Sequence, residues 1–314
     1  MISKKFRYAS FITIENMEKR KFGKTDMEVT VLGFGGAEIG YENATQEDVT
    51  KLLNAALDAG LNVIDTAAAY LESEKMIGEA VGKRRKEFYL LSKCGALDNF
   101  TRFDWSKKGI VETIEQSLRN LKTDYLDIAQ LHSCDAEILR QGDCIEGLQR
   151  AQEKGYTRYI GYSGDRDEAK YAIEMDVFDS FQTSVNIADQ TPIEGNIKLA
   201  EEKGLGVIAK RPIANAAWRN SEKPENSYLH EYWERLQKLK FDFLDKSLEE
   251  SVAQALRFTM SIPGVDTMIV GTAKPNRWQS NAKIVAEGKL SGEEFEAIRD
   301  RWREVANESW VGMT

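Results

Sequence analysis

The stretch TQEDVTKLLNAALDAGLNVID, residues 45–65, decides the predicted fold because it contains a helix, a helix stop and a strand in succession. Thr45 is a helix-capping residue, acidic side chains occupy the first predicted turn, and Gly60 ends the helix. Apolar residues recur between these ends at the spacing of one helix face: Val49, Leu52, Leu53, Ala56 and Leu57. The apolar residues after Gly60 predict a short, largely buried strand that ends at Asp65.

The same order of helix, glycine and strand recurs twice more along the chain. It appears in AQEKGYTRYIGYS, with its stop at Gly155, and in AEEKGLGVIAKRP, with its stop at Gly204. Eight strands are predicted: VTVLGF, LNVID, EFYLLSK, LDIAQLH, RYIGYS, FDSFQTS, LGVIAK and TMIVGT. Helical segments alternate with them, which favours a parallel sheet. Eight such units over roughly 250 residues are typical of a closed (β/α)8 TIM barrel.

The domain organisation follows from this alternation. A length of 314 residues allows either two small domains or one barrel. An open dinucleotide-binding sheet needs GxGxxG after its first strand, and LGFGGAEIG lacks the third glycine in register. No linker rich in Pro, Gly or Ser interrupts the pattern, so we predict one barrel over residues 17–314. It begins with a β-hairpin in which KRKF and VTVLGF flank GKTDM, and residues 1–16 are interpreted as an extension, with disorder as one interpretation.

The composition is that of a soluble globular protein, with 42% hydrophobic and 30% charged residues. No apolar run approaches the ~20 residues of a membrane span. A net charge of -8 argues against a basic nucleic-acid-binding surface, so a small-molecule partner fits better. The cysteines Cys94, Cys134 and Cys144 form neither a CxxC motif nor an even set, which indicates a reducing compartment and predicts a cytoplasmic location.

Polar residues stand where the predicted strands end. Asp65 ends the second strand, Lys93 the third and His132 the fourth, and Ser163 and Gln182 follow in the fifth and sixth. In a barrel of this kind the carboxyl ends of the strands face one site, so these side chains are expected to converge. A buried acid is costly without a cation nearby, and Lys93 supplies one for Asp65.

One long segment interrupts the regular alternation. Residues 212–245 separate the seventh strand from its helix, and loops of this length tend to be functional. Trp218, Tyr228 and Trp233 either line or cover a site, or pack the segment down onto the surface. His230, the second of only two histidines, lies in the same segment and is interpreted as structural.

Four of these residues resemble the catalytic tetrad of the aldo-keto reductases: Asp65, Tyr70, Lys93 and His132. The phrases around them are similar to that family's motifs in order and context: LGFGG, NVIDTAAAY, LLSK and LKTDYLDIAQLH. The resemblance runs from about Met17 to the end of the chain. It implies a (β/α)8 barrel that transfers hydride reversibly from NADPH to the carbonyl of an aldehyde or ketone.

The four residues suit that chemistry. Hydride addition to a carbonyl carbon leaves charge on oxygen, and Tyr70 is expected to protonate it as the general acid. A tyrosine has a pKa near 10, and we expect Lys93 to lower it while Asp65 holds Lys93 in place and charged. His132 is expected to hydrogen-bond the carbonyl oxygen and orient the substrate. The alternative is a buried Asp and Lys pair with a packing tyrosine.

The resemblance also implies contacts to the cofactor. Ser163 and Gln182 resemble the pair that hydrogen-bonds the nicotinamide carboxamide, with Gly36 and Ala37 along the cofactor and Asp65 beside it. Two departures from the family pattern stand out. Gly164 replaces an asparagine, and Lys210, followed by Arg211, replaces an aromatic residue that stacks on the nicotinamide. These cations are expected either to contact the pyrophosphate or to be solvated.

The segment after the eighth strand, GTAKPNRWQSN, resembles the family's adenosine-phosphate segment. It offers a helix N-terminus and two cations, a combination that suits a phosphate group. Its expected contacts are Gly271, Lys274, Arg277 and Asn281. Arg277 matches the residue that meets the 2′-phosphate, which favours NADPH over NADH.

The sequence allows other interpretations of its glycines and of its function. Gly33, Gly35 and Gly36 either approach a ligand closely or simply form a turn. A cofactor-binding regulatory subunit that senses redox state, similar to the barrel subunits of potassium channels, is the alternative function. A metal-dependent hydrolase needs a ligand cluster, and only His132, His230 and Asp65 are available, so no metal site is predicted.

Overall fold

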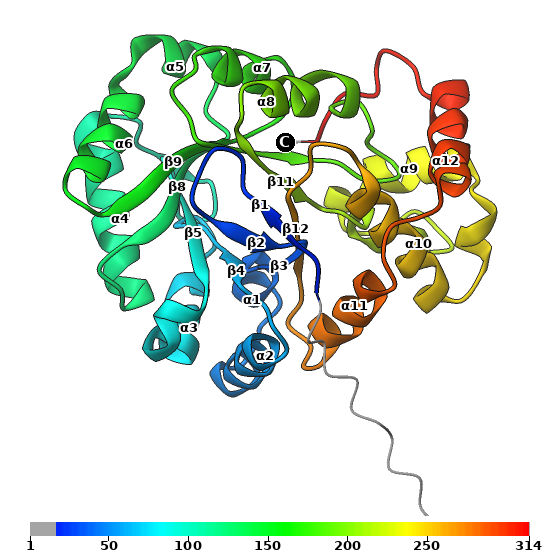
Figure 1. Ribbon diagram of the computed structural model, residues 1–314, viewed down its shortest axis with the longest axis horizontal. Helices are drawn as coiled ribbons and strands as arrows, with labels where there is room; N and C mark the ends of the chain where they lie inside the picture. The colour runs from blue at the N-terminus through cyan, green and yellow to red at the C-terminus, as the bar shows by residue number, and fades with distance from the viewer. Residues whose placement is uncertain (1–16, 314) are drawn as a thin grey trace, which may run out of the picture.

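A computed structural model describes residues 17–313, and the predicted extension at residues 1–16 lies outside the described residues. Eight parallel strands close into a barrel (Figure 1). In barrel order they are β3 (Leu32–Gly35), β4 (Val63–Asp65), β5 (Tyr89–Cys94), β8 (Leu126–His132), β9 (Thr157–Ser163), β10 (Ser180–Ser184), β11 (Gly206–Lys210) and β12 (Thr267–Gly271). The predicted (β/α)8 barrel is confirmed.

An antiparallel hairpin precedes the barrel, as predicted, and consists of β1 (Lys19–Lys21) and β2 (Glu28–Thr30). The segment predicted as one strand, VTVLGF, is divided between β2 and β3. The division falls at Val31, next to Thr30, whose amide and hydroxyl both bond the Asn62 side chain. Phe22 and Met27 of the hairpin turn pack with residues of five barrel strands: Val63, Leu91, Ile128, Ile208 and Ile269. The hairpin therefore closes the amino end of the barrel.

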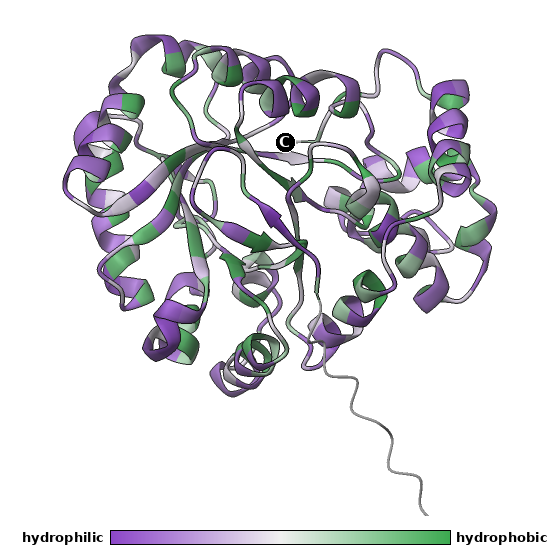
Figure 2. Cartoon of the chain, viewed as in Figure 1, coloured by the Kyte–Doolittle hydropathy of each residue, from purple (hydrophilic) through white to green (hydrophobic). Residues whose placement is uncertain are grey.

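Helices alternate with the strands and cover the outside of the barrel. Those that follow successive strands are α1 (Ala37–Tyr41), α2 (Gln46–Asp58), α3 (Ser73–Val81), α4 (Lys107–Leu121), α5 (Ala136–Gln141), α6 (Asp143–Glu153), α7 (Arg166–Glu174), α8 (Lys198–Glu202), α9 (His230–Leu239), α10 (Leu248–Ser261), α11 (Arg277–Ala286) and α12 (Gly292–Val305). Figure 2 shows that hydrophobic and hydrophilic residues alternate along these helices, as amphipathic helices require. None of the helices in residues 17–313 is long and apolar enough to cross a membrane.

The predicted helix of residues 45–60 forms α2 and begins as expected. The Thr45 side chain accepts a hydrogen bond from the Asp48 amide, and all five predicted apolar residues are buried. Gly60 follows with a φ of 96°, a left-handed value that favours glycine, and lets the chain turn directly into the strand. The apolar face of the helix and the position of Asp65 at the end of β4 thus come from one continuous stretch.

The long segment after β11 is present, and it carries structure of its own. It contains α9 and three short 3-10 turns at Ala214–Arg219, Ser227–Leu229 and Asp242–Asp245. Trp218 donates to Ser251 through its indole nitrogen, and Trp233 donates to the Asn220 carbonyl. These two tryptophans pack the segment down, whereas Tyr228 is half exposed and bonds Arg211.

Candidate active site

Asp65 and Lys93 form a buried ion pair at the carboxyl ends of β4 and β5. Lys93 Nζ lies 2.5 Å from Asp65 Oδ2 and donates a second hydrogen bond of 2.8 Å to the Thr66 carbonyl. Burial raises the pKa of Asp65 and lowers that of Lys93, and the contact between the two charges opposes both shifts. The pairing expected from the strand ends is therefore present.

Tyr70 lies in the loop after β4, above this pair. Its ring centroid is 5.1 Å from Lys93 Nζ, and its hydrogen-bonded turn, Tyr70 amide to Ala67 carbonyl, holds the loop in place. Burial, and then the charge of Asp65, raise the pKa of Tyr70 well above its ordinary value. The expected lowering of this pKa by Lys93 is not found, because burial and the Asp65 carboxylate dominate.

His132 ends β8 and stands edge-on to Tyr70, with the two ring centroids 5.5 Å apart. The histidine is buried, and its Nδ1 has no hydrogen-bond partner among residues 17–313. Burial, followed by the charges of Lys93, Lys210 and Arg211, lowers the pKa of His132 well below its ordinary value. The imidazole is therefore neutral near pH 7, and either ring nitrogen can carry the proton.

The sequence did not predict the aromatic residue that covers His132. Phe100 lies in the loop between β6 (Ala96–Leu97) and β7 (Arg102–Phe103), with its ring 4.8 Å from that of His132. Asp98, Asn99 and Phe100 all have left-handed φ values, between 49° and 59°. Such values are uncommon outside glycine, so neither the short strands nor the loop had a recognisable sequence signal.

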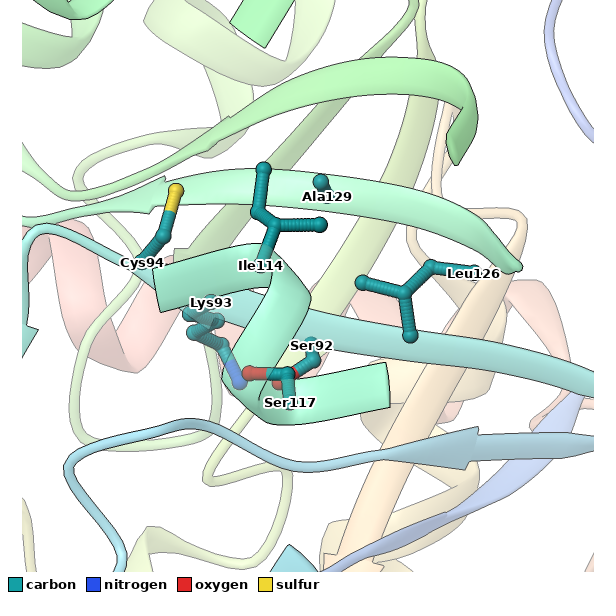
Figure 3. A pocket seen from close by; sticks show the side chains of 7 residues that line it. All are labelled: Ser92, Lys93, Cys94, Ile114, Ser117, Leu126 and Ala129. Carbon is teal, nitrogen blue, oxygen red and sulfur yellow. The ribbon is translucent and has the colours of Figure 1, made fainter. Parts of the chain in front are cut away.

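The space behind Lys93 is tightly packed. Figure 3 shows the gap there, which is lined by residues of β5, β8 and α4 and their flanks: Ser92, Lys93, Cys94, Ile114, Ser117, Leu126 and Ala129. The gap has no room for a water molecule. Solvent therefore does not reach the Lys93 side chain through it.

A larger hollow of about 460 Å³ lies beside the Tyr70 loop, between α3, α4 and the β6–β7 hairpin. Acidic residues outnumber basic ones in its lining. The acids are Glu72, Glu74, Asp98, Asp104 and Glu112, and the bases are Lys75 and Arg102. This charge does not suit the phosphates of a dinucleotide, so the hollow is a poor fit to the cofactor.

Ser163 and Gln182 occupy neighbouring strands at the same level of the barrel. The two residues are register partners in β9 and β10, and both side chains are buried. Ser163 Oγ and Gln182 Oε1 have no hydrogen-bond partner among the described residues. Buried polar atoms are nearly always paired, so this pair fits a ligand that supplies hydrogen-bonding groups, as a carboxamide does.

The departure at Gly164 has a structural cause. A Cβ atom at this position would lie 2.6 Å from the Tyr162 ring, and the Tyr162 hydroxyl donates to the Cys134 carbonyl. The ring thus fills the space next to Gly164. The Gly164 amide donates to the Gln182 carbonyl at 3.0 Å, which keeps β9 and β10 aligned where Ser163 and Gln182 lie.

Lys210 is largely buried and ion-paired rather than freely solvated. Its Nζ lies 2.8 Å from Asp165 Oδ2, and Asp165 also accepts hydrogen bonds from Thr183 Oγ1 and the Ser184 amide. Sequence reasoning missed Asp165, because it follows β9 by two residues and nothing local marks it as a partner for β11. Arg211 turns away from this pair toward Tyr228 and Ser184.

A left-handed turn lies just beyond Arg211. Ala214, Asn215 and Ala216 have consecutive left-handed φ values of 44°, 53° and 49°. The amides of Ala214 and Ala216 donate to the carbonyls of Arg211 and Ile213, so the turn satisfies these two donors itself. The alanines gave no sequence signal, since alanine rarely adopts these angles.

The predicted phosphate segment lies at the end of β12. Lys274 and Arg277 are exposed, α11 begins at Arg277, and Asn281 is buried on the same helix. The Glu38 carboxyl lies so close to Gly271 that a Cβ there would collide with it. Burial, opposed in part by Arg211, raises the pKa of Glu38 to about 7. The structure thus places a titratable acid between β3 and β12, which the sequence did not indicate.

The glycines of β3 meet other parts of the chain. A Cβ at Gly36 would lie 2.8 Å from Ser73 Oγ, and the Gly36 amide donates to the Asp65 carbonyl. Packing against α3 therefore accounts for Gly36. Ala37 begins α1 on the rim of the same strand. Among residues 17–313 no three His, Cys, Asp or Glu side chains are grouped so that they could hold a metal ion.

Comparison with known proteins agrees with this geometry. The Aldo/keto reductase family model matches residues 31–303. An uncharacterized oxidoreductase of Bacillus subtilis (strain 168) is 28% identical over 92% of this chain and 97% of its own. L-galactose dehydrogenase of Arabidopsis thaliana is 25% identical over 90% and 93%.

Solved structures share the fold. An aldo-keto reductase from Bacillus halodurans in its holo form has a TM-score of 0.80 and 26% identity, and the match covers 94% of this chain and 99% of that one. An aldo-keto reductase from Klebsiella pneumoniae in complex with NADPH has a TM-score of 0.73 at 22% identity, over 95% and 100% of the two chains. The family match spans most of the chain and includes all four residues of the tetrad. The chain belongs to the aldo-keto reductase family.

Proposed function

We propose that this protein reduces the carbonyl of a small aldehyde or ketone with hydride from NADPH, and that Tyr70 is the general acid. The observation that carries the proposal is the buried pair of Asp65 and Lys93 beneath the Tyr70 ring, with neutral His132 edge-on beside it. These four groups meet at the carboxyl end of the barrel, where barrel enzymes carry their active sites.

The protein's own groups suit the protonation step. When bound, NADPH would supply the hydride to the carbonyl carbon. Tyr70 keeps its proton near neutral pH because its pKa is raised, and an alkoxide oxygen is basic enough to take it. Neutral His132 can donate a hydrogen bond to the same oxygen, and Lys93 lies within reach to stabilise the phenolate that remains.

Chain residues of three neighbouring regions would hold the cofactor. Ser163 and Gln182 would bond the nicotinamide carboxamide, since each leaves a buried polar atom open. The remaining proposed contacts are Gly36, Ala37, Asp65, Gly271, Lys274, Arg277 and Asn281. Lys210 would act through Asp165, which it holds next to Ser184.

Arg277 supports the choice of NADPH over NADH. The guanidinium is exposed at the first turn of α11, where the helix N-terminus also favours a phosphate. One similar structure, the Klebsiella pneumoniae protein in complex with NADPH, has the same fold. Buried free thiols at Cys94, Cys134 and Cys144 agree with a reducing compartment, and a cytoplasmic location belongs to the proposal.

The regulatory-subunit alternative is not favoured. The relatives reported above are named as an oxidoreductase, a dehydrogenase and aldo-keto reductases, and each name denotes redox chemistry. A regulatory subunit would bind NADPH with little turnover. Steady-state reduction of a panel of aldehydes and ketones by the purified protein therefore separates the two functions.

The variant Tyr70→Phe tests the proposed acid. It removes one hydroxyl, so we expect carbonyl reduction to fall by roughly 10²- to 10⁴-fold while the Kd for NADPH stays nearly unchanged. The matched control is Tyr89→Phe at the opposite end of the barrel, where the hydroxyl bonds only the Glu28 amide. Full activity in Tyr70→Phe would refute the role of Tyr70.

A further inference from the structure

We propose that Arg211 forms an anion-binding subsite in the substrate cleft, so that the protein prefers aldehydes or ketones that carry a carboxylate. This inference rests on the proposed carbonyl reduction and adds the chemical class of its substrate. The sequence allowed two interpretations of Arg211, a cofactor contact or a solvated cation. Contacts, charge and position each bear on it.

Neutral groups hold the Arg211 side chain. Its Nε donates to the Tyr228 hydroxyl at 2.6 Å, and its Nη1 donates to Ser184 Oγ at 2.6 Å and to the Met313 carbonyl at 2.7 Å. Nη2 has no hydrogen-bond acceptor among residues 17–313. The guanidinium is thus fixed on one side and leaves donors open on the other.

Arg211 also lacks a counter-ion within the described part of the chain. No carboxylate of residues 17–313 lies within 4.0 Å of it. The most buried cations each have an acidic partner: Lys93 with Asp65, Lys210 with Asp165, Arg235 with Glu231 and Arg299 with Glu194. Arg211 is only partly buried, so an anion from outside residues 17–313 can reach its guanidinium and pair with it.

Arg211 lies at the end of the barrel that carries the reacting groups. Its charge is among those that lower the pKa of His132, after burial, Lys93 and Lys210, and it opposes the rise that burial causes in the pKa of Tyr70. Tyr228, to which it bonds, also acts on Tyr70. Arg211 directly follows β11, and its partner Ser184 ends β10, so the guanidinium lies at the same end of the barrel as the tetrad.

The pyrophosphate of the cofactor is the competing occupant. Lys210, the other cation at the end of β11, is committed to Asp165. Arg211 points instead toward Tyr228 and Ser184. A carboxylate on the substrate would bond the open Nη2 in a charge-assisted hydrogen bond.

The experiment compares two aldehydes of similar shape, 4-carboxybenzaldehyde and benzaldehyde. Their kcat/KM values are measured for the wild type, Arg211→Met, Arg211→Lys and the control Arg166→Met. Arg166 is a suitable control because it also bonds the C-terminal segment, through the Gly312 carbonyl, but is exposed. Thermal melts establish that each variant folds, and NADPH fluorescence gives the cofactor Kd.

We expect the wild type to favour the carboxylated aldehyde, and Arg211→Met to lower that preference by roughly 10- to 100-fold. Arg211→Lys should keep part of it, Arg166→Met all of it, and the Kd for NADPH should change little. An unchanged preference in Arg211→Met would overturn the inference. Equal losses for both aldehydes with a weaker Kd for NADPH would overturn it too and assign Arg211 to the cofactor.

A binding measurement separates this inference from the proposed function. Calorimetry with 4-(hydroxymethyl)benzoate, the alcohol that reduction would yield, reports the subsite without turnover, and benzyl alcohol is its neutral control. Binding of the carboxylate that is lost in Arg211→Met supports the subsite even if no aldehyde is reduced, a result that would refute only the proposed function. Absence of such binding to the wild type refutes the subsite.

Discussion

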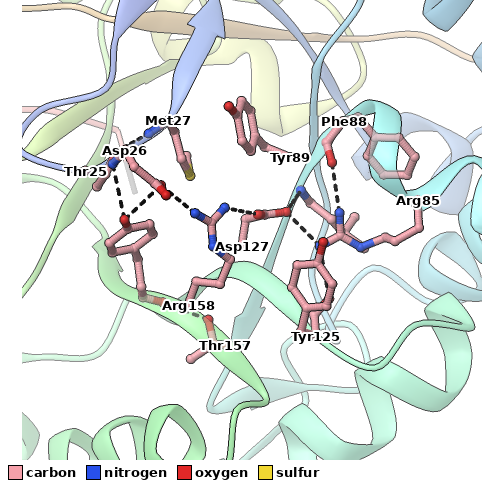
Figure 4. Close-up of polar contacts among 12 residues, drawn as sticks. Thr25, Asp26, Met27, Arg85, Phe88, Tyr89, Tyr125, Asp127, Thr157 and Arg158 are labelled. Atoms are coloured by element: carbon pink, nitrogen blue, oxygen red, sulfur yellow. Dashed lines mark hydrogen bonds and ion pairs between the residues drawn. The ribbon is translucent and has the colours of Figure 1, made fainter.

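The two ends of the barrel bury acidic residues in different ways. At the amino end, Asp127 near the start of β8 lies between two arginines (Figure 4). Its Oδ2 is 2.7 Å from Arg85 and accepts from the Leu90 amide, and its Oδ1 is 2.7 Å from Arg158. Arg158 continues to Asp26 in the hairpin. Both carboxylate oxygens of Asp127 are fully used.

At the carboxyl end the polar groups are left partly open. Asp65 is paired with Lys93, yet His132 Nδ1, Ser163 Oγ and Gln182 Oε1 have no partner among residues 17–313. Buried polar atoms without partners are destabilising, so their gathering at one end indicates a site that a ligand completes. Charge is therefore buried at the amino end to hold the hairpin and strands together, and at the carboxyl end for chemistry.

Removing Lys93 should have the largest effect on activity. Lys93→Met leaves Asp65 without its cation and Tyr70 without the charge that stabilises its phenolate. We expect kcat to fall by roughly 10²- to 10⁴-fold, measured as NADPH oxidation with an aldehyde. A wild-type kcat in Lys93→Met would contradict a catalytic role for the charges at the carboxyl end.

Removing Asp127 should have the largest effect on stability and little on activity. Asp127→Asn leaves Arg85 and Arg158 without their shared anion, which costs about 3 to 5 kcal/mol of unfolding free energy when a buried pair loses one partner. Urea unfolding measures this, with the exposed acid of Asp124→Asn as the matched control. Unchanged stability together with lost activity would reverse the assignment of the two ends.

Arg277→Ala sharpens the account of the carboxyl end by testing one cofactor contact. We expect the KM for NADPH to rise on the order of 10-fold and the KM for NADH to change little, because only NADPH carries the 2′-phosphate. Lys283→Ala removes another exposed cation from α11 and serves as the control. Equal changes for the two cofactors would remove the 2′-phosphate assignment.

The smallest effect concerns pH. The pKa of Glu38 is raised to about 7 by burial, with Glu42 adding to the rise and Arg211 opposing it. As the pH rises through 7, Glu38 ionises beside Gly271, so binding of anionic NADPH should weaken a few-fold between about pH 6 and 8. Glu38→Gln should flatten this dependence in fluorescence titrations. An unchanged slope in that variant would exclude Glu38 as its source.

Much of the architecture follows from periodicity in the sequence. The helix of residues 46–58 and the strand ending at Asp65 could be predicted because local spacing sets both. The convergence of Asp65, Lys93 and His132 followed from the barrel, since parallel strands end at one face. The convergence of these three side chains could thus be predicted from the sequence.

Other features depend on contacts between distant segments. The pairing of Asp165 with Lys210 joins β9 to β11, and no local pattern marks it. Residues 214–216 and Phe100 adopt left-handed φ values without being glycine, so no sequence signal predicted them. The contact of Phe100 with His132 was not predicted for the same reason. The pKa of Tyr70 was predicted in the wrong direction because burial, which the sequence does not measure, and the charge of Asp65 raise it.

Isotope transfer tests directly whether the protein moves hydride from NADPH to a carbonyl with Tyr70 as the acid. The protein is incubated with NADPH carrying deuterium at the transferred position of the nicotinamide and with benzaldehyde, and the alcohol is analysed by mass spectrometry. We expect the wild type and Tyr89→Phe to yield alcohol with one deuterium on the former carbonyl carbon. We expect Tyr70→Phe to yield almost no alcohol. Unlabelled alcohol from the wild type, or no alcohol from a panel of carbonyls, would contradict this hydride transfer.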